Sequence, residues 1–246
     1  MPEVPLKGQI ALITGAGSGI GKAIATILAG QGVNLVLNGR NHQKLTETAE
    51  TIKQSHPGVE ILLAPGDVTQ SSKAESLITQ TIDAFGRLDI LINNAGISGK
   101  IALLQEISVE EIDRTLATNL NAPIYLMRSA IPVMVRQQQG VIININSIAG
   151  KTAFPYWSVY DASKFGLRAM TEAVAEEQRT NNIKVIGIYP GAVDTPIWQG
   201  IELDSPPDPK GMLTSESIAN AVLFALHQPS GTYVSEVSVS PLQPAL

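Results

Sequence analysis

Tyr160 and Lys164 stand four residues apart in the segment Ser-Val-Tyr-Asp-Ala-Ser-Lys, so on a helix both side chains project from one face. A phenol has an ordinary pKa of about 10, and a neighbouring ammonium group favours the phenolate and lowers this pKa. A tyrosine with a pKa closer to neutral can donate a proton to a carbonyl oxygen or accept one from an alcohol. Surface pairs that only pack their stems have the same spacing, so the rest of the sequence must distinguish the two interpretations.

The composition argues against several other classes of function. The 246 residues are 44% hydrophobic and 16% charged, the net charge is −5, and no cluster of Lys and Arg suits a nucleic-acid backbone. Cysteine is absent, which excludes disulfides and thiolate metal sites, and we expect no metal centre. The N-terminus lacks the apolar stretch of a secretory signal, and no apolar run is long enough to span a bilayer. We expect a cytoplasmic protein that acts on a small molecule, without nucleic-acid or membrane partners.

Short aliphatic stretches alternate with longer amphipathic stretches along the chain. The aliphatic stretches predict seven strands, at 9–14, 33–38, 59–64, 88–92, 141–146, 183–188 and 233–239. The amphipathic stretches predict helices at 19–31, 42–54, 71–85, 109–136, 158–180 and 215–227. This alternation predicts an α/β fold with a doubly wound parallel sheet, covered by helices on both faces. We expect one domain over 1–246, with a Pro- and Gly-rich substrate loop at 197–211.

A glycine-rich turn follows the first predicted strand and leads into the first predicted helix. It reads Thr-Gly-Ala-Gly-Ser-Gly-Ile-Gly over 14–21. Glycines let backbone amides approach a pyrophosphate, and the helix N-terminus adds N–H groups and the positive end of its dipole. The spacing departs from Gly-x-Gly-x-x-Gly, and a purely structural strand-to-helix turn is the alternative. The predicted cofactor contacts here are Thr14, Gly15, Gly17, Ser18, Gly19, Ile20 and Gly21.

The end of the second strand bears on the choice of cofactor. Proteins that prefer NAD usually place an acidic residue there for the ribose hydroxyls, whereas this chain has Gly39 followed by Arg40 and Asn41. A planar guanidinium can bind a 2′-phosphate, so the sequence favours NADP(H) over NAD(H); a solvated arginine that opens a loop is the alternative. Asp67 and Val68, after the third strand, are predicted to border the adenine, although Asp67 could instead cap the next helix.

Polar and small residues end the fourth and fifth strands. Asn94, Ala95 and Gly96 follow the fourth strand, where they could line the cofactor or simply form a turn. Ser147 follows the fifth strand, at the carboxyl edge where open parallel sheets bind their ligands. Its hydroxyl could therefore donate to the same carbonyl oxygen that Tyr160 protonates.

Together these segments resemble the short-chain dehydrogenase/reductase family, from residue 8 to about residue 239. The shared marks are the glycine-rich turn, Asn-Asn-Ala-Gly at 93–96, Asn119, Ser147, Tyr-x-x-Ser-Lys at 160–164 and a Pro-Gly segment at 190–195. The resemblance implies a Rossmann sheet with strand order 3-2-1-4-5-6-7 and hydride transfer between an alcohol and a carbonyl group with NAD(P). It also implies a homodimer or homotetramer.

The resemblance further implies a role for each matching residue. Tyr160 would be the general acid/base, and Lys164 would lower its pKa and bind the nicotinamide ribose. Ser147 would position the substrate oxygen. Asn119 would hold the water that connects Lys164 to solvent, although by itself it could be a tolerated surface amide in a helix. The nicotinamide carboxamide would be fixed by the segment after the sixth strand, which contributes Pro190, Gly191, Val193 and Thr195.

Apolar residues near the same edge predict the substrate pocket. They are Ile97, Ile148, Phe154, Trp157, Ile197 and Trp198. Only 4% of the chain is aromatic, so two tryptophans here favour an apolar pocket, although such rings also pack loops. Lys100 and Lys151 are expected within reach. The family's usual glycine pair after the last strand is replaced by Ser235–Pro241, which argues against a ketoacyl reductase of fatty-acid synthesis and against a tetramer built through that edge.

The sequence thus predicts an NADP(H)-dependent oxidoreductase that reduces a ketone, an aldehyde or a 3-oxoacyl group to an alcohol, or catalyses the reverse reaction. Two alternatives stay open. One is a catalytically inactive NAD(P)-binding sensor or scaffold on the same fold, and the other is an alcohol dehydrogenase that prefers NAD(H).

Overall fold

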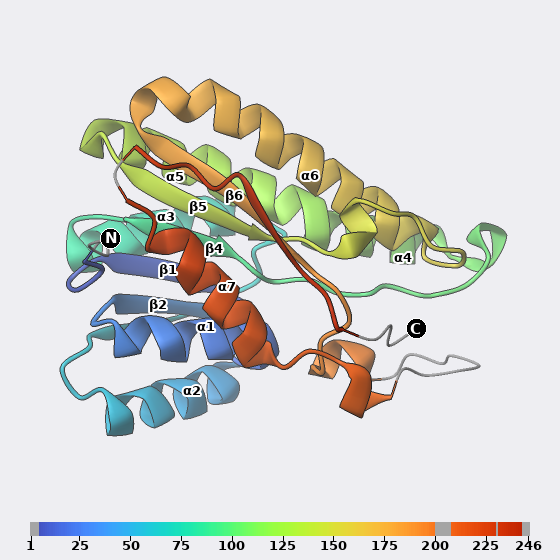
Figure 1. The fold of residues 1–246 in the computed structure, drawn as a ribbon, viewed down its shortest axis with the longest axis horizontal. Coiled ribbons are helices and arrows are strands. Elements are labelled where there is room, and N and C mark those ends of the chain that lie inside the picture. The colour runs from blue at the N-terminus through green and yellow to red at the C-terminus, as the bar shows by residue number, and fades with distance from the viewer. Residues whose placement is uncertain (1–4, 200–207, 230, 243–246) are drawn as a thin grey trace.

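A seven-stranded parallel sheet forms the centre of the molecule, in a computed structural model that describes residues 5–199, 208–229 and 231–242 (Figure 1). The strands are β1 (Ile10–Thr14), β2 (Asn34–Gly39), β3 (Ile61–Pro65), β4 (Ile90–Asn93), β5 (Gly140–Ile145), β6 (Ile183–Pro190) and β7 (Glu236–Val239). Their order is β3-β2-β1-β4-β5-β6-β7, and every neighbouring pair is parallel. The predicted doubly wound Rossmann sheet is therefore confirmed.

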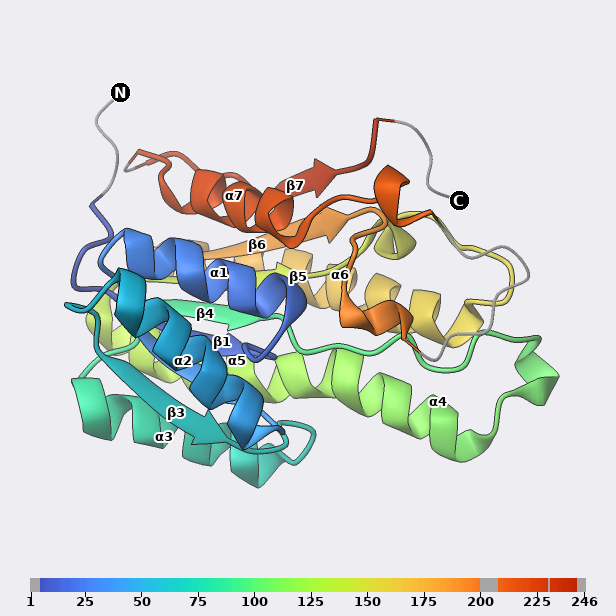
Figure 2. The same ribbon diagram turned by 90° about the horizontal axis from the view of Figure 1, so that it is seen from below.

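Helices cover both faces of this sheet. The main helices are α1 (Gly19–Gly30), α2 (His42–Ser55), α3 (Ser71–Phe85), α4 (Val109–Leu116), α5 (Ala122–Gln137), α6 (Ser158–Gln178) and α7 (Ser215–Leu226). One apolar core joins α1, α2 and α7 to the sheet, and the other joins α3, α5 and α6 to its opposite face (Figures 1 and 2). Successive β1 residues enter opposite cores, Ala11 one and Leu12 the other, as strand geometry requires. No helix in the described ranges combines the length and apolarity that a membrane span requires.

Two elements differ from the sequence prediction by more than two residues. The single helix expected at 109–136 is interrupted by a π-helical segment, Ala117–Asn121, between α4 and α5. Such insertions carry one extra residue per turn and occur often at functional sites; here the segment contains Asn119. The last strand begins at Glu236 rather than at Tyr233, whose side chain instead donates a 2.6 Å hydrogen bond from its hydroxyl to the carbonyl of Val185 in β6.

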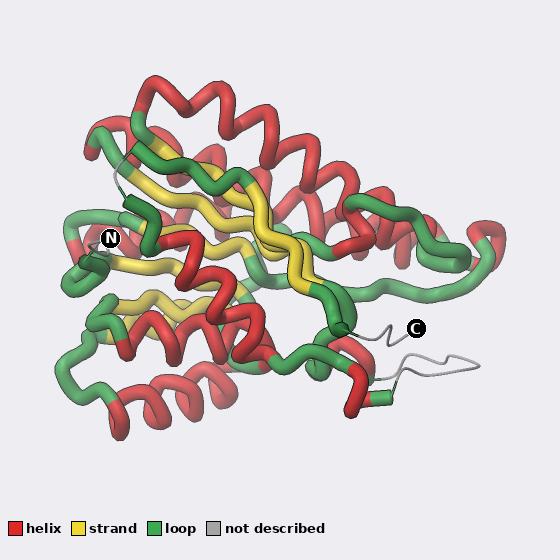
Figure 3. Tube along the Cα trace, viewed as in Figure 1, coloured by secondary structure: helices red, strands yellow, loops and turns green. Residues whose placement is uncertain are grey.

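The parallel arrangement places the carboxyl ends of all seven strands at one edge of the sheet. Figure 3 shows the loops after β4, β5 and β6 leaving from this same end. Because the predicted site residues follow the carboxyl ends of different strands, this edge is where they can assemble. The core strands beneath are fully buried, which fixes the positions from which the loops depart.

Candidate active site

A cleft with a volume of about 1060 Å³ lies along the carboxyl edge. Most residues predicted from the sequence line it, namely Gly15, Gly17, Ser18, Gly19, Ile20, Arg40, Asn41, Asp67, Val68, Asn94, Ala95, Gly96, Ile97, Ser147, Ile148, Phe154, Trp157, Tyr160, Lys164, Pro190, Gly191, Val193, Thr195, Ile197 and Trp198. Thr14, Gly21 and Asn119 are buried behind its surface. Residues 200–207 of the expected substrate loop 197–211 lie outside the described residues.

The glycine-rich turn forms the middle of the cleft floor. Gly19 begins α1 with a φ of 51°, in the left-handed region, and a Cβ there would lie 3.3 Å from the Thr195 side chain. Ser18 is the N-cap of α1, but its side chain makes no capping hydrogen bond. The first N–H groups of the helix have no intrahelical acceptor and are not capped by Ser18. This narrow turn with unused amide donors fits the pyrophosphate of a dinucleotide.

Thr14 and Asn94 hold the turn from behind. The Thr14 hydroxyl accepts hydrogen bonds from the backbone N–H groups of Asn94 and Ala95, both at 3.0 Å. The Asn94 amide in turn donates to the carbonyls of Thr14 at 2.8 Å and Gly15 at 3.3 Å. These bonds tie the end of β1 to the end of β4. Thr14 is only 1% exposed and supports the turn, and its predicted contact with the cofactor stays a prediction.

The end of the cleft beside β2 and β3 carries positive side chains. Arg40 and Lys44 both line it and both are exposed. The Asn41 side chain accepts a 3.0 Å hydrogen bond from the Lys44 N–H and so caps α2. Asp67 accepts a 3.0 Å hydrogen bond from the Thr69 N–H, and it does not cap α3, whose N-cap is Gln70. Asp67 therefore closes a local turn at the cleft edge.

Ser147, Tyr160 and Lys164 meet on one wall at the other end of the cleft. Ser147 leaves β5, whereas Tyr160 and Lys164 lie on adjacent turns of α6, as their spacing predicts. The Lys164 ammonium lies 5.6 Å from the centre of the Tyr160 ring and donates a 3.1 Å hydrogen bond to the carbonyl of Ile145. The three side chains come from two elements and share one cleft wall.

Burial is the largest cause of the pKa shifts of Tyr160 and Lys164. It raises the pKa of Tyr160 to about 12, which a hydrogen bond with Ser147 offsets in part and the charge of Asp161 reinforces. Burial lowers the pKa of Lys164 to about 8. The expected lowering of the Tyr160 pKa by Lys164 stays a prediction, because burial of the phenol sets the direction of the net shift. Up to about pH 12, Tyr160 holds a proton that it can donate.

Lys164→Met is expected to remove a pH-dependent part of the protein's stability. The pKa of Lys164 is about 8 in the folded protein, against 10.5 for an ordinary lysine. Between these values the unfolded chain binds more protons, so wild-type stability should rise with pH, by at most about 1.4 kcal/mol per pH unit. Above about pH 10 the raised pKa of Tyr160 acts in the opposite direction.

Urea denaturation between pH 8 and about 10 measures this difference. Lys164→Met should show a flatter profile than the wild type, and the exposed-lysine control Lys100→Met should keep the wild-type slope. Identical slopes in Lys164→Met and the wild type would show that Lys164 titrates normally in the folded state.

Asn119 connects the loop after β4 to α6. Its side chain is fully buried, accepts a 2.9 Å hydrogen bond from the Ile97 N–H, and donates to the Ile97 carbonyl and the Ser163 hydroxyl. Ser163 in turn donates a 2.6 Å hydrogen bond to the Tyr160 carbonyl. Because Asn119 is fully buried, the alternative that it is a tolerated surface amide is wrong. The role of Asn119 in holding a water for Lys164 stays a prediction, since both amide N–H groups are bound to protein atoms.

Sequence reasoning does not identify Lys44 and Asp161 as site residues. Lys44 lies in the first turn of α2, four residues after Arg40, and this spacing is a signal that could have found it. Asp161 is 4% exposed, and its Oδ2 accepts a 2.7 Å hydrogen bond from the Phe154 N–H, which fixes the loop before α6. Burial raises the pKa of Asp161. The sequence signal that could have identified Asp161 is its position as an acidic residue in the first turn of a predicted helix.

Comparison with known proteins identifies the same family. Residues 9–205 match the family model for short chain dehydrogenase. An uncharacterized oxidoreductase of Staphylococcus aureus is 38% identical over 239 residues, covering 96% of this chain and 99% of the relative. The crystal structure of a metagenomic short-chain oxidoreductase in complex with NADP is 32% identical, with a TM-score of 0.84, and covers 98% of this chain and 100% of that one. Levodione reductase is 28% identical, with a TM-score of 0.88 and 96% of both chains covered.

The family match spans most of the chain, and the sheet order and the cleft at the carboxyl edge agree with it. The chain therefore belongs to the short-chain dehydrogenase family and is an NAD(P)-dependent oxidoreductase of alcohol and carbonyl groups.

Proposed function

We propose that this protein reduces a ketone, an aldehyde or a 3-oxoacyl group to an alcohol, or oxidises the alcohol, with NADP(H) as cofactor. The observation that carries the proposal is the meeting of Ser147, Tyr160 and Lys164 on one wall of the cleft that also contains the glycine-rich turn. Consumption of NADPH over a panel of ketones, aldehydes, ketoacyl thioesters and diketones tests it. A panel without turnover would favour the inactive sensor or scaffold.

The three side chains divide the proton chemistry among them. Bound NADPH supplies the hydride. Tyr160, protonated at neutral pH by its raised pKa, donates its proton to the carbonyl oxygen as the negative charge develops there. The Ser147 hydroxyl donates a hydrogen bond to the same oxygen and sets its position. The Lys164 ammonium, charged below its pKa of about 8, stabilises the phenolate that remains.

The preference for NADP(H) rests on the charges beside β2. Arg40 and Lys44 line that end of the cleft, and Gly39 places no carboxylate at the end of β2, where NAD-preferring proteins usually have one. Two cations at the edge of an adenosine site favour a 2′-phosphate over a 2′-hydroxyl. The NADP complex of the metagenomic relative supports this choice.

Arg40→Ala is expected to weaken NADPH binding by about 10- to 100-fold, since hydrogen bonds to charged groups contribute about 1.5–3 kcal/mol. NADH binding should change much less, because NADH carries no 2′-phosphate for Arg40 to bind. Titration of both cofactors by fluorescence measures the two affinities. Lys53→Ala, which removes an exposed charge at the far end of α2, is the control. Equal affinities for NADPH and NADH in the wild type would overturn the proposed preference for NADP(H), and tighter binding of NADH would favour the NAD(H)-preferring alternative.

We propose that one domain over 1–246 carries both the cofactor and the substrate sites, with 197–211 as the substrate loop. Ile197 and Trp198 line the cleft at the start of this loop, which supports that assignment. Association into a homodimer or homotetramer stays a prediction, and sedimentation of the purified protein tests it.

A further inference from the structure

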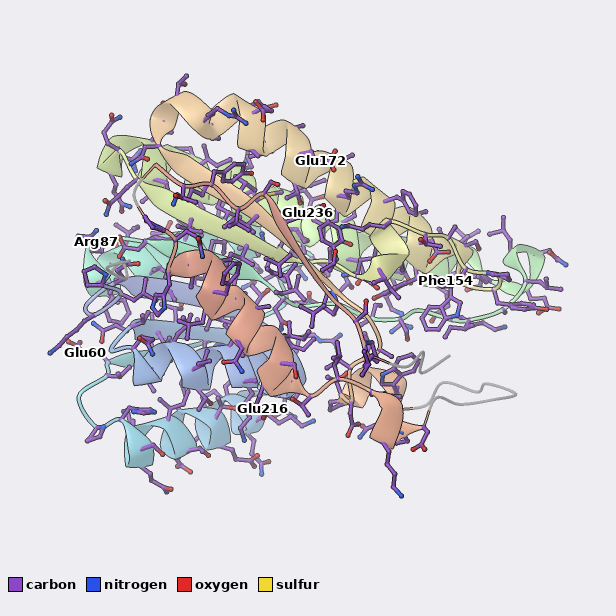
Figure 4. The ribbon with its side chains drawn as sticks, viewed as in Figure 1. Glu60, Arg87, Phe154, Glu172, Glu216 and Glu236 are labelled. Atoms are coloured by element: carbon purple, nitrogen blue, oxygen red, sulfur yellow. The ribbon has the colours of Figure 1, made fainter. Side chains whose placement is uncertain are left out.

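Aromatic rings are concentrated around the reacting end of the cleft. The chain has two tryptophans, and both line it. The Trp157 ring packs edge-to-face against Tyr160 at 5.5 Å and against Trp198 at 6.0 Å, measured between ring centres. Phe154 lines the same cleft from the loop before α6 (Figure 4). Trp157 and Trp198 are therefore linked by ring contacts to the phenol that we propose as the proton donor, and Phe154 lines the same cleft.

Hydrogen bonds hold these rings in place. The Trp198 indole donates a 2.8 Å hydrogen bond from Nε1 to the Val193 carbonyl, and this bond anchors the turn after β6. The backbone of Phe154 is held by Asp161, as described above. The indole N–H of Trp198 is thus already hydrogen-bonded within the protein, and the rest of the ring is apolar. A wall of fixed rings selects a ligand by shape and apolar contact, with few polar groups to satisfy.

Among the described residues at the same end of the cleft, the charged side chains are Lys164 and Arg114, and the Arg114 guanidinium is paired with Glu111 at 2.7 Å. Among the described residues that line it from 145–160 and 190–199, none is Asp, Glu, Lys, Arg or His. The two lysines expected within reach are bound elsewhere: Lys100 donates to the Glu106 carbonyl, and Lys151 binds Glu236 and Ser238 on β7. A carboxylate or phosphate on the substrate would therefore meet no unpaired cationic side chain from 145–160 or 190–199 other than Lys164.

We infer that the substrate is an uncharged ketone, or the corresponding secondary alcohol, whose carbonyl group is attached to a flat six-membered ring that packs against Trp157 and Trp198. This inference rests on the proposed carbonyl reduction and narrows its substrate. Stacked or edge-to-face contact with a planar ring adds to simple apolar burial, and a flexible chain loses more conformational entropy when it is bound.

Three methyl ketones distinguish the effects of a planar ring, an open chain and a negative charge on kcat/KM. Acetophenone carries the ring, 2-octanone has the same number of carbon atoms in an open chain, and 4-acetylbenzoate adds a carboxylate to the ring. With NADPH, kcat/KM for acetophenone should exceed that for 2-octanone by about fivefold or more and that for 4-acetylbenzoate by about tenfold or more. Equal values for acetophenone and either of the other two would overturn the inference.

Replacement of the rings tests where the preference arises. Trp157→Leu should lower the acetophenone to 2-octanone ratio of kcat/KM by about threefold or more. Phe224→Leu removes an exposed ring on α7, outside the cleft, and should leave the ratio unchanged. A wild-type ratio in Trp157→Leu would show that the ring contact is not the source of selectivity.

Binding can be followed without turnover, because the indole N–H signals of a ¹⁵N-labelled sample come from the two tryptophans alone. Trp157→Phe and Trp198→Phe each remove one signal and so assign both. Titration with acetophenone should move both signals saturably, whereas 4-acetylbenzoate should move neither at the same concentration. If acetophenone binds in this way but no ketone is reduced, the proposed function fails, whereas the inferred binding site for a planar ring at Trp157 and Trp198 (the ring site) stands. If ketones are reduced but acetophenone leaves both signals unmoved, the ring site fails and the proposed function stands.

Discussion

Tyr160→Phe is expected to lower kcat for ketone reduction by about 10²- to 10⁴-fold, the range that general acid–base groups contribute. The phenylalanine ring fills the same volume and can keep the edge-to-face contact with Trp157, so the variant should fold. It removes only the hydroxyl, and with it the proton that we propose Tyr160 donates. Steady-state NADPH consumption measures the effect.

Tyr156→Phe is the matched control for this loss. Tyr156 lies four residues before Tyr160, is 57% exposed and does not line the cleft, so the loss of its hydroxyl should leave kcat within about twofold. If Tyr160→Phe kept kcat within tenfold of the wild type, another group would have to be the proton donor.

The second large effect is expected from Gly21→Ala. A Cβ at this position would lie 2.3 Å from the Gly15 carbonyl oxygen and 2.5 Å from the Asn94 side-chain nitrogen. The turn must therefore open, at a cost of about 1–3 kcal/mol in the free energy of unfolding. The amide donors of the turn would move with it, so NADPH should bind about tenfold or more weakly. Urea denaturation and cofactor titration measure the two effects.

Gly30→Ala provides a comparison within the same helix. The nearest atom to a Cβ there, in the His56 ring, is at 3.6 Å, which is ordinary contact. Because alanine is the better helix former, this change should stabilise the protein by up to about 1 kcal/mol and leave cofactor binding unchanged. Equal effects of the two substitutions would show that the turn tolerates a side chain at Gly21.

The parallel sheet and most residues that line the cleft could be predicted because they depend on local patterns, whereas the strand order was implied by the family resemblance. Apolar runs that end in Gly15, Asn94 or Ser147 mark both a strand and its functional end, so one signal locates both. The π-helical segment could not be predicted, because it is stabilised by bonds from Asn119 to Ile97 and Ser163, which are distant in the sequence.

The direction of a pKa shift also could not be predicted from the sequence. The spacing of Tyr160 and Lys164 correctly placed both side chains on one helix face, but the direction of the Tyr160 pKa shift depends on burial, which the spacing does not give. Lys44 and Asp161 were overlooked for a similar reason. Each looks like an ordinary surface residue of a helix until its contacts are known.

Transfer of deuterium from NADPH labelled at both C4 positions tests the central claim most directly. The wild-type protein is incubated with the labelled cofactor and a mixture of acetophenone, 2-octanone and 4-acetylbenzoate, and the alcohols formed are analysed by mass spectrometry. We predict one deuterium on the carbinol carbon of the product, with Tyr160→Phe forming it at a rate reduced in parallel with kcat. Absence of labelled alcohol from every ketone in the wild-type reaction would contradict carbonyl reduction by this protein.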